Sequence, residues 1–319
     1  MMSRIKALFR AILKDRGKLK AVILQRLSRF YTSDEKYLKR LYRYQMGQEL
    51  NLDNPQTFSE KLQWLKLYNR KPEYTQMVDK YEAKKYVAKI IGEEYIIPTL
   101  GVWDKFDDID FDTLPNQFVL KTTHGGGNTG VVICRDKSAF DKNKAKRKLE
   151  KSLKSDIYRS LREWPYKNIK KRIIAEQYIE VEGQSDLPDY KFFCFYGVPQ
   201  YCQVIRNRNS NETIDFYDME WDHMIFVGLN PVNQSGIGYV AKNGIKPVDK
   251  PRQLNEMISI CKQLAHNIPF VRVDMYVINE ITYFGEITFF PASGLGCFNP
   301  SEWDFKLGEM IQLNHIPHR

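Results

Sequence analysis

The pattern of residues 117–133 predicts an apolar strand, a glycine-rich loop and a second apolar strand. The first strand ends near Lys121, and the loop contains Gly125, Gly126 and Gly127. Glycine lets backbone amides surround an anion closely, which suits a phosphate. A P-loop would close on Gly-Lys-Ser/Thr and continue as a helix, which this segment does not. We therefore expect a loop that covers a nucleotide. The alternative is a plain hairpin turn, although a hairpin needs fewer glycines.

The composition is that of a globular protein whose charge is unevenly distributed. The 319 residues, 43% hydrophobic and 28% charged, suffice for one large or two medium domains. Residues 1–43 hold thirteen Lys/Arg and three acidic residues, which equals the whole net charge of +10. The rest of the chain is neutral, which argues against nucleic acid as a partner. The five cysteines form no CxxC pair and favour a reducing cytoplasm over a disulfide or zinc framework.

Residues 1–50 are predicted as a basic amphipathic helical segment. Apolar residues recur at helical spacing from Ile5 to Leu13 and from Leu19 to Phe30, and Lys and Arg occupy the other face. No apolar run is long enough to cross a membrane. One interpretation, favoured slightly by the charge, is a helix on an anionic membrane surface, with the protein peripheral to its inner face. The other is a helix that packs on the body of the protein.

Residues 51–319 combine helices with strands that follow one another closely, which predicts an α+β fold. We expect two helices within 56–91, the second over about 75–91, and further helices within 142–172 and 254–268. Strands are expected at 95–98, on both sides of the glycine loop, and over 172–179, 190–196, 199–206, 270–277 and 281–288.

Two carboxylates are predicted to face each other in the last hairpin. Asp274 and Glu286 lie on its two strands around a tight turn, so they can be cross-strand neighbours. Arg272 and Thr288 would share the same face at a period of two. Two acids in apolar strands repel each other unless a cation lies between them, and Mg²⁺ takes oxygen ligands together with substrate phosphates. The alternative is a structural ion pair with Arg272.

Several blocks, taken in order, resemble the TupA-like ATP-grasp family of bacterial surface-polysaccharide gene clusters. The resemblance covers about residues 50–300 and implies the ATP-grasp fold, in which two α+β subdomains clasp ATP. Residues 51–319 would form the catalytic domain, with a lid subdomain over about 98–178 and residues 1–50 as a helical extension. The matching blocks are Asn54–Lys66, Asp79–Tyr81, Pro115–Lys121, Asp189–Phe192 and Gly285–Thr288.

The resemblance implies roles for individual residues. Lysines and the glycine loop would hold the triphosphate, and the hinge after the fourth predicted strand would read adenine and ribose. The expected nucleotide-binding residues are Lys80, Lys121, Gly125, Gly126, Gly127, Glu176, Gln177, Ile179, Lys191 and either Glu180 or Glu182. The expected catalytic residues are Arg272, Lys191 and His124, and the expected Mg²⁺ ligands are Asp274, Glu286 and Thr288.

The chain departs from the family's pattern in two places. Many ATP-grasp ligases have Asn two residues after the second metal acid, followed by a basic residue, whereas this chain has Thr288 and Phe290. The Thr hydroxyl still offers an oxygen to a metal, but the missing base weakens the case for acyl-phosphate chemistry. Residues 1–53 are too short for the α/β domain that usually precedes the core. The acceptor pocket should therefore be completed by residues 207–250 and 289–319.

The function implied is an ATP- and Mg²⁺-dependent carboxylate–amine ligase that forms an amide through an acyl-phosphate. Its acceptor would be a sugar acid or amino acid, on a lipid-linked precursor if the membrane interpretation holds, in a capsule, exopolysaccharide or teichuronopeptide-like polymer. One alternative, motivated by Thr288 and Phe290, is a sugar or polyol kinase. A second is a glycosyltransferase-type polysaccharide biosynthesis protein, which the lack of a clear Asp-x-Asp metal motif disfavours.

Overall fold

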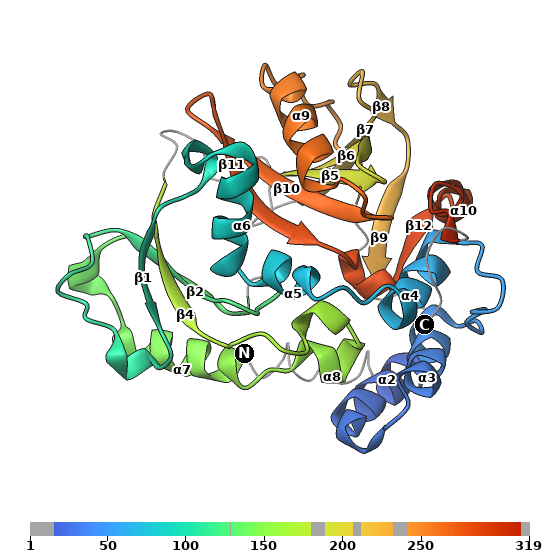
Figure 1. Cartoon of the computed structure of the whole chain (residues 1–319), viewed down its shortest axis with the longest axis horizontal. Coiled ribbons are helices and arrows are strands. Elements are labelled where there is room, and N and C mark those ends of the chain that lie inside the picture. Colours follow the sequence, from blue (N-terminus) through green and yellow to red (C-terminus); the bar gives the residue numbers. More distant parts are fainter. Residues whose placement is uncertain (1–15, 128, 180–188, 207–211, 232–241, 314–319) are drawn as a thin grey trace.

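A computed structural model describes residues 16–127, 129–179, 189–206, 212–231 and 242–313. Three antiparallel sheets and the helices packed on them form this part of the chain, which confirms the α+β class (Figure 1). The first sheet has the order β1-β4-β2-β3 and comprises β1 (Thr99–Trp103), β2 (Phe118–Thr122), β3 (Val131–Cys134) and β4 (Ile173–Gln177).

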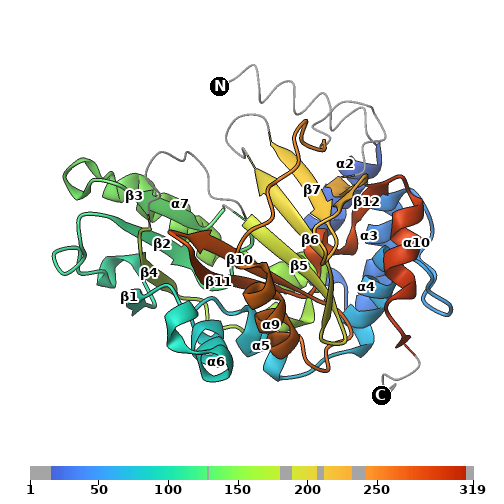
Figure 2. The ribbon, with the colours of Figure 1, turned by 90° about the horizontal axis from the view of Figure 1, so that it is seen from above.

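The second sheet has six strands in the order β11-β10-β5-β6-β7-β8, and β9 pairs with β12 in a small third sheet. Seen from above, the four-stranded sheet lies at one end of the molecule and the six-stranded sheet in the middle (Figure 2). The remaining strands are β5 (Asp189–Phe195), β6 (Val198–Arg206), β7 (Thr213–Tyr217), β8 (His223–Met224), β9 (Val227–Pro231), β10 (Val271–Ile278), β11 (Ile281–Thr288) and β12 (Gly296–Asn299).

Each of the two larger sheets has its own hydrophobic core. On the four-stranded sheet, α7 (Lys142–Leu153) buries Leu149 against β2 and β3. The six-stranded sheet carries α9 (Leu254–Leu264) against β5, β6 and β10. All seven residues of β5 are buried, and Phe193 on this strand packs against Phe58 and Phe270. Phe58 begins α4 (Phe58–Tyr68), which packs on α10 (Glu302–Glu309). The two cores let the sheets form separate walls of one site.

The predicted helix over 75–91 is wrong in one respect, because it is broken in the middle. The structure has α5 (Glu73–Val78) and α6 (Glu82–Ile91), separated at Asp79. The Asp79 carboxylate accepts hydrogen bonds from the amides of Tyr81 and Glu82, at 2.9 and 3.1 Å, and so begins a new helix. The Lys80 amide, freed from a helical partner, donates instead to Thr123 O at 2.9 Å. The break therefore joins the helices to the glycine loop.

Other predicted elements differ in position. The strand expected at 95–98 is wrong, since a 3₁₀ turn over Glu93–Tyr95 precedes β1. The helix expected over 142–172 ends with α7, and a second helix, α8 (Ile157–Leu161), begins where the Asp156 side chain accepts from the Arg159 amide at 2.9 Å. The last hairpin is confirmed, with Asn279 and Glu280 at positive φ in its two-residue turn.

The N-terminal helices pack on the body of the protein. They are α2 (Arg16–Arg26), a 3₁₀ turn over Ser28–Phe30, and α3 (Asp34–Met46), which begins at a Ser33 cap. Buried residues of α2 are Ala21 and Leu24, whereas the predicted apolar stripe turns outward. Ile23, Leu27 and Phe30 are 47%, 46% and 66% exposed. None of the described helices is both long and apolar enough to span a membrane. The expected helix over residues 5–13 lies outside the described residues.

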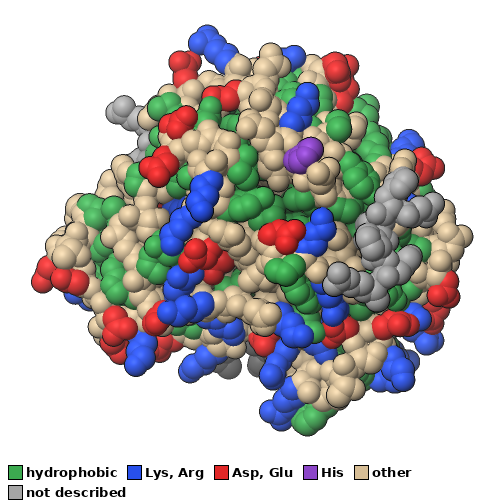
Figure 3. Space-filling model, in the orientation of Figure 1, with side chains coloured by type: hydrophobic (Ala, Val, Ile, Leu, Met, Phe, Trp, Pro, Cys, Tyr) green, Lys and Arg blue, Asp and Glu red, His purple; other side chains and the backbone are tan. Residues whose placement is uncertain are grey.

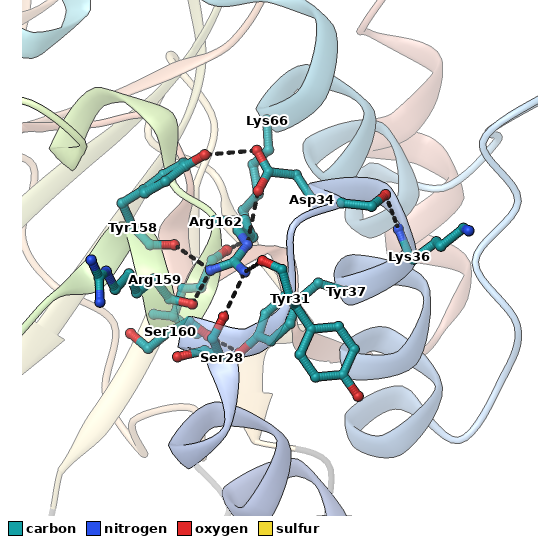
Figure 4. A network of polar contacts seen from close by, with 12 residues as sticks. Ser28, Tyr31, Asp34, Lys36, Tyr37, Lys66, Tyr158, Arg159, Ser160 and Arg162 are labelled. Atoms are coloured by element: carbon teal, nitrogen blue, oxygen red, sulfur yellow. Dashed lines mark hydrogen bonds and ion pairs between the residues drawn. The ribbon is translucent and has the colours of Figure 1, made fainter.

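A buried arginine anchors these helices to α8 (Figure 4). The Arg162 side chain is 3% exposed, and its Nε lies 2.9 Å from Asp34 Oδ1. The same guanidinium donates to the carbonyl oxygens of Ser28 and Tyr31, at 3.0 and 3.1 Å, and lies over the Tyr37 ring. One planar cation thereby holds the start of α3 and the turn before it in a single position.

We expect this anchor to dominate the stability of the N-terminal helices. Arg162→Met keeps the length of the side chain but removes the buried donor from Ser28 O and Tyr31 O and one cation from Asp34, which keeps Arg70 at 2.7 Å. The loss should lower the free energy of unfolding by about 3 kcal/mol. Arg159→Met is the matched control, because Arg159 is 62% exposed and its loss should cost less than about 0.5 kcal/mol. Urea unfolding and amide exchange in α3 measure both, and equal midpoints for the two variants would contradict the assignment.

Candidate functional site

The glycine loop leaves β2, turns back over the sheet and enters β3. Gly125 is required by its surroundings, since a Cβ there would lie 2.6 Å from Thr122 Oγ1. Gly126 and Gly127 are exposed, and a Cβ on either would meet no atom within 4 Å. Packing within the described protein therefore does not require glycine at these two positions. Their backbone is open to a close approach by a ligand. Asn128, at the tip, lies outside the described residues.

A buried carboxylate gathers two lysines beneath this loop. Glu176 on β4 is 5% exposed, and its side chain pairs with Lys84 Nζ at 2.6 Å and with Lys121. Burial raises the pKa of Glu176, but the Lys121 and Lys84 charges outweigh it and lower the pKa to about 2. Lys84 also donates to Ile97 O at 2.6 Å. The first wall of the site is thus a fixed, fully ionised group with Lys121 at its edge.

A row of charges crosses the six-stranded sheet on the other wall. Lys191 on β5 is directly opposite Asp274 on β10, and Asp274 is directly opposite Glu286 on β11. Residues paired in this way point to the same face of a sheet. Lys191 Nζ donates a hydrogen bond to the Asp274 carboxylate, and it also lies 2.9 Å from Asp189 Oδ2. The sequence prediction that the two acids are cross-strand neighbours is therefore confirmed in its geometry.

Arg272 joins the ends of this row. Its guanidinium makes two hydrogen bonds to Asp274, at 2.6 and 2.7 Å, and further contacts to Glu286 at 3.5 Å and to Thr288 Oγ1 at 3.2 Å. Lys80 Nζ lies 2.8 Å from Glu286 Oε2. Burial raises the pKa of Glu286, but the charges of Lys80, Lys191 and Arg272 outweigh it and hold that pKa far below its usual range. Glu286 is therefore ionised at every physiological pH.

A cavity of about 360 Å³ lies between the glycine loop and the β10–β11 hairpin, and Lys84, Lys121 and Glu176 of the first wall do not line it. Gly126 and Gly127 of the loop line one side of it, and Arg272, Glu286 and Thr288 line another. In the face shown in Figure 3, acidic and basic side chains lie next to each other across the middle of the surface. The rest of the cavity wall consists of Gln45, Ile157, Leu161, Glu163, Tyr166, Phe290, Pro291, Ala292, Ser293 and Leu295.

The wall of this cavity differs in part from the expected one. Residues 290–295 belong to the C-terminal segment that was expected to complete the acceptor pocket. The other expected segment, 207–250, contributes no described lining residue, and α3, α8 and the turn after α8 contribute instead. The reason is the Arg162 anchor, which brings the N-terminal helices and α8 together beside the site.

The fit of Mg²⁺ to the predicted ligands is uneven. Asp274 is fully buried, and both its oxygens accept hydrogen bonds from Arg272. Glu286 is 35% exposed on its side chain and faces the cavity beside Thr288. Within the described residues, no group of three His, Cys, Asp or Glu side chains could hold a metal by itself. A magnesium ion that keeps substrate phosphates as ligands needs only one or two carboxylates, and Glu286 fits that role best.

Three predicted residues lie away from the phosphate side of the site. His124 is buried, and its Nε2 lies 3.1 Å from Ser152 O at the end of α7, so it is not among the cavity residues. The predicted catalytic role of His124 therefore has no support in this geometry. Gln177 and Ile179 follow Glu176 at the end of β4, where Gln177 N donates to Pro98 O at 3.0 Å. Glu180 and Glu182 lie outside the described residues.

Two residues of the site were not predicted from the sequence. Lys84 shares the Glu176 carboxylate with Lys121, and Glu163 lines the cavity. Lys84 lies four residues after Lys80, and this spacing could have suggested a second lysine on the same side of the helix start. Glu163 lies in a basic stretch between helices, and no local pattern marks it.

Glu176→Gln should remove a pH-dependent part of the stability. The folded pKa of about 2 lies below the ordinary 4.5, so ionised Glu176 contributes roughly 3 kcal/mol above pH 4.5, lost as the pH falls toward 2. The difference in unfolding free energy between wild type and variant should therefore be largest near neutral pH and shrink in acid. Urea unfolding along a pH series measures it, with exposed Glu150→Gln as the control. A difference independent of pH would contradict the assignment.

Several solved structures are similar to this chain at low sequence identity. No curated protein matches the sequence. Among solved structures, D-alanine–D-alanine ligase from Bacillus anthracis is 18% identical, with 79% of this chain and 67% of that chain covered and a TM-score of 0.40. The same ligase complexed with ATP is 20% identical, with coverages of 74% and 63% and a TM-score of 0.40. A D-cycloserine synthetase is 14% identical, with coverages of 75% and 70% and a TM-score of 0.42.

The family comparison covers all of the candidate site except Gln45. A family model described as TupA-like ATPgrasp matches residues 60–312, a range that begins before Lys80 and ends after Thr288. That match spans most of the chain and agrees with the sequence blocks. The chain belongs to the TupA-like ATP-grasp family.

Proposed function

We propose that this protein is an ATP-dependent carboxylate–amine ligase. The observation that carries the proposal is the row of Lys191, Asp274 and Glu286, which joins Arg272 at a cavity covered by the glycine loop. This arrangement brings cations, one accessible carboxylate and exposed backbone amides to the same space. Such a set suits a triphosphate with its metal and offers no covalent nucleophile, so that catalysis would consist of positioning and charge neutralisation.

The residues of the two walls would divide the work. Lys80 and Lys121 would bind the phosphates, and the loop around Gly126 would close over them and exclude water. Mg²⁺, held by Glu286 beside Thr288, would neutralise phosphate charge when bound. Lys80 and Glu286 pair with each other at 2.8 Å. When ATP and Mg²⁺ bind, Lys80 would pair with a phosphate and Glu286 with the metal ion. Without the nucleotide, their mutual pairing keeps both charges satisfied in a partly buried site.

The cavity favours a carboxylate as the phosphorylated group. Arg272 lines this cavity while its Nε and Nη2 are held by Asp274, and its positive charge would attract a substrate carboxylate. A neutral sugar or polyol hydroxyl would gain less from such a cation. We therefore keep the sugar or polyol kinase as the second hypothesis. The sugar acid or amino acid of a surface polysaccharide remains the proposed acceptor, and a site in the cytoplasm is proposed with it.

Glu286→Gln should lower ATP turnover roughly 100-fold or more while the protein stays folded, because it removes the accessible metal carboxylate. ADP release with Mg²⁺-ATP across uronic acids and amino acids measures turnover, and circular dichroism checks the fold. The matched control is Glu280→Gln in the exposed turn of the same hairpin, which should keep full activity. Hydroxylamine added to the reaction identifies the product by mass. A hydroxamate supports the ligase, whereas a phosphate ester would support the kinase.

We also propose that the N-terminal helices bind an anionic membrane surface. Ile23, Leu27 and Phe30 recur at a helical spacing and are exposed on one face. Arg16, Lys20, Arg26 and Arg29 are exposed around them, and Figure 3 shows basic and hydrophobic side chains together at the lower end of the molecule, where α2 lies. An apolar strip flanked by Lys and Arg matches the interface of a bilayer that contains anionic lipids.

Co-sedimentation with phosphatidylglycerol vesicles tests this membrane proposal. Binding should weaken as salt increases and be weak on phosphatidylcholine vesicles, because the attraction is partly electrostatic. The double change Leu27→Asp with Phe30→Asp should reduce binding at least about tenfold, since each side chain contributes apolar area. Ile245→Asp, at a fully exposed position elsewhere, is the control. Vesicle binding that changes neither with salt concentration nor with the double substitution would refute the proposal.

A further inference from the structure

Glu163 is a buried carboxylate that the proposed reaction has not used. It follows α8, is 7% exposed, and lines the same cavity as Arg272 and Glu286. Within the described residues, its carboxylate forms no ion pair with a lysine or arginine; the charge of Lys66 acts on it from a greater distance. A buried charge of this kind is costly unless it has a purpose or a partner. Its partner therefore has to be sought in the cavity.

The support behind Glu163 fixes its side chain. Lys66 Nζ is fully buried and donates to Ser293 Oγ and Ser293 O, both at 2.8 Å, as well as to Leu161 O at 3.0 Å. The ammonium of Lys66 is thus hydrogen-bonded to oxygens other than those of Glu163. Burial raises the pKa of Glu163, while the charge of Lys66 and the Ser293 side chain lower it. Ser293 therefore acts on both groups, and Glu163 keeps no ion pair of its own among the described residues.

The turn that carries Ser293 is itself held in a rare backbone conformation. Ala292 and Ser293 have φ values of 46° and 57°, in the left-handed region that non-glycine residues seldom adopt. Such a conformation costs free energy and persists only where its surroundings determine it. Here the surroundings are the Lys66 bonds and Gln63 Nε2, which donates to the carbonyl oxygens of Ser293 and Gly294 at 3.0 and 2.8 Å. Buried α4 therefore keeps the Ser293 hydroxyl beside Glu163.

The cavity has opposite charges at separate positions in its wall. Arg272, with the accessible Glu286, belongs to the β10–β11 hairpin, and Glu163 belongs to the turn after α8. Between these polar groups the wall includes apolar side chains, among them Leu161 and Phe290. The volume of about 360 Å³ lies at the lower end of the range for small-molecule sites, so the cavity would hold reacting groups and not whole substrates.

We propose that Glu163 binds the amine of the second substrate as a primary ammonium group. This inference rests on the proposed ligase function for the identity of the ligand as a substrate. An ammonium group donates charge-assisted hydrogen bonds to a carboxylate, and it would supply the cation that Glu163 lacks. With the acyl group near Arg272 and the amine at Glu163, both reactants would occupy one cavity. Glu163 would then be a specificity-determining residue for an amine over a hydroxyl nucleophile.

Two probes that differ in one group test this proposal on the full chain. Glycinamide carries a primary ammonium, and glycolamide carries a hydroxyl in its place. Calorimetry or ligand-detected NMR measures their binding to the wild type with Mg²⁺ and a non-hydrolysable ATP analogue. Glycinamide should bind at least about tenfold more tightly, as expected for a charge-assisted bond. Glu163→Gln should abolish that preference, whereas Glu302→Gln, at an exposed position, should retain it.

The outcomes separate this inference from the proposed function. Equal binding of the two probes to the wild type, or an unchanged preference in Glu163→Gln, would overturn it. Affinity for the ATP analogue is measured in the same samples and should be unchanged in Glu163→Gln. If the wild type does not bind the ATP analogue, the result would count against the proposed ligase function and not against the role of Glu163. If Glu163→Gln does not fold, Ser293→Ala should weaken glycinamide binding severalfold, and an unaltered preference there would refute the role of Glu163.

Discussion

The structure of the site depends on ion pairs along β5, β10 and the edge strand β11 of the six-stranded sheet. Asp274 is surrounded by Arg272 and Lys191, and Glu286 by Lys80 and Arg272. A single charge at such a position would be strongly unfavourable, so these residues are tolerable only as a set. The set also has to be rebuilt when phosphates and metal enter. Phosphates and metal then replace ion pairs that already exist, and the protein without ligand does not contain unpaired buried charges at these positions.

The same pairs explain how two separate cores can hold one site. The four-stranded sheet presents Glu176 with Lys84 and Lys121, and the six-stranded sheet presents Glu286 with Lys80. Lys80 lies in the break just before α6 and Lys84 in the first turn of α6, so this segment contributes a cation to each wall. The break at Asp79 makes this possible, because it frees the Lys80 amide to bond Thr123 at the base of the glycine loop. A continuous helix would have left the loop without that tie.

The sequence was sufficient to predict those parts of the site that are set by local rules. A tight turn and a period of two place Asp274 opposite Glu286, and glycines after a strand that holds Lys121 indicate a phosphate loop. The parts that escaped prediction depend on distant contacts. Glu163 matters because Ser293 and Lys66 meet it from far away in the chain, and His124 turns to Ser152 because α7 packs behind it. The orientation of α2 was left open between two interpretations for a similar reason, since helical periodicity cannot say which side meets α8.

The N-terminal helices take part in the site as well as in the proposed membrane contact. Gln45, in the last turn of α3, lines the cavity that also contains Glu163 and Arg272. The Arg162 anchor fixes α3 against α8, and α8 leads directly into Glu163. The N-terminal helices and α8 therefore form part of the cavity wall. If α2 binds a bilayer, α3 and α8, which pack against α2 and line the cavity, lie close to that surface. A lipid-linked acceptor would then meet the cavity from the side on which its carrier is held.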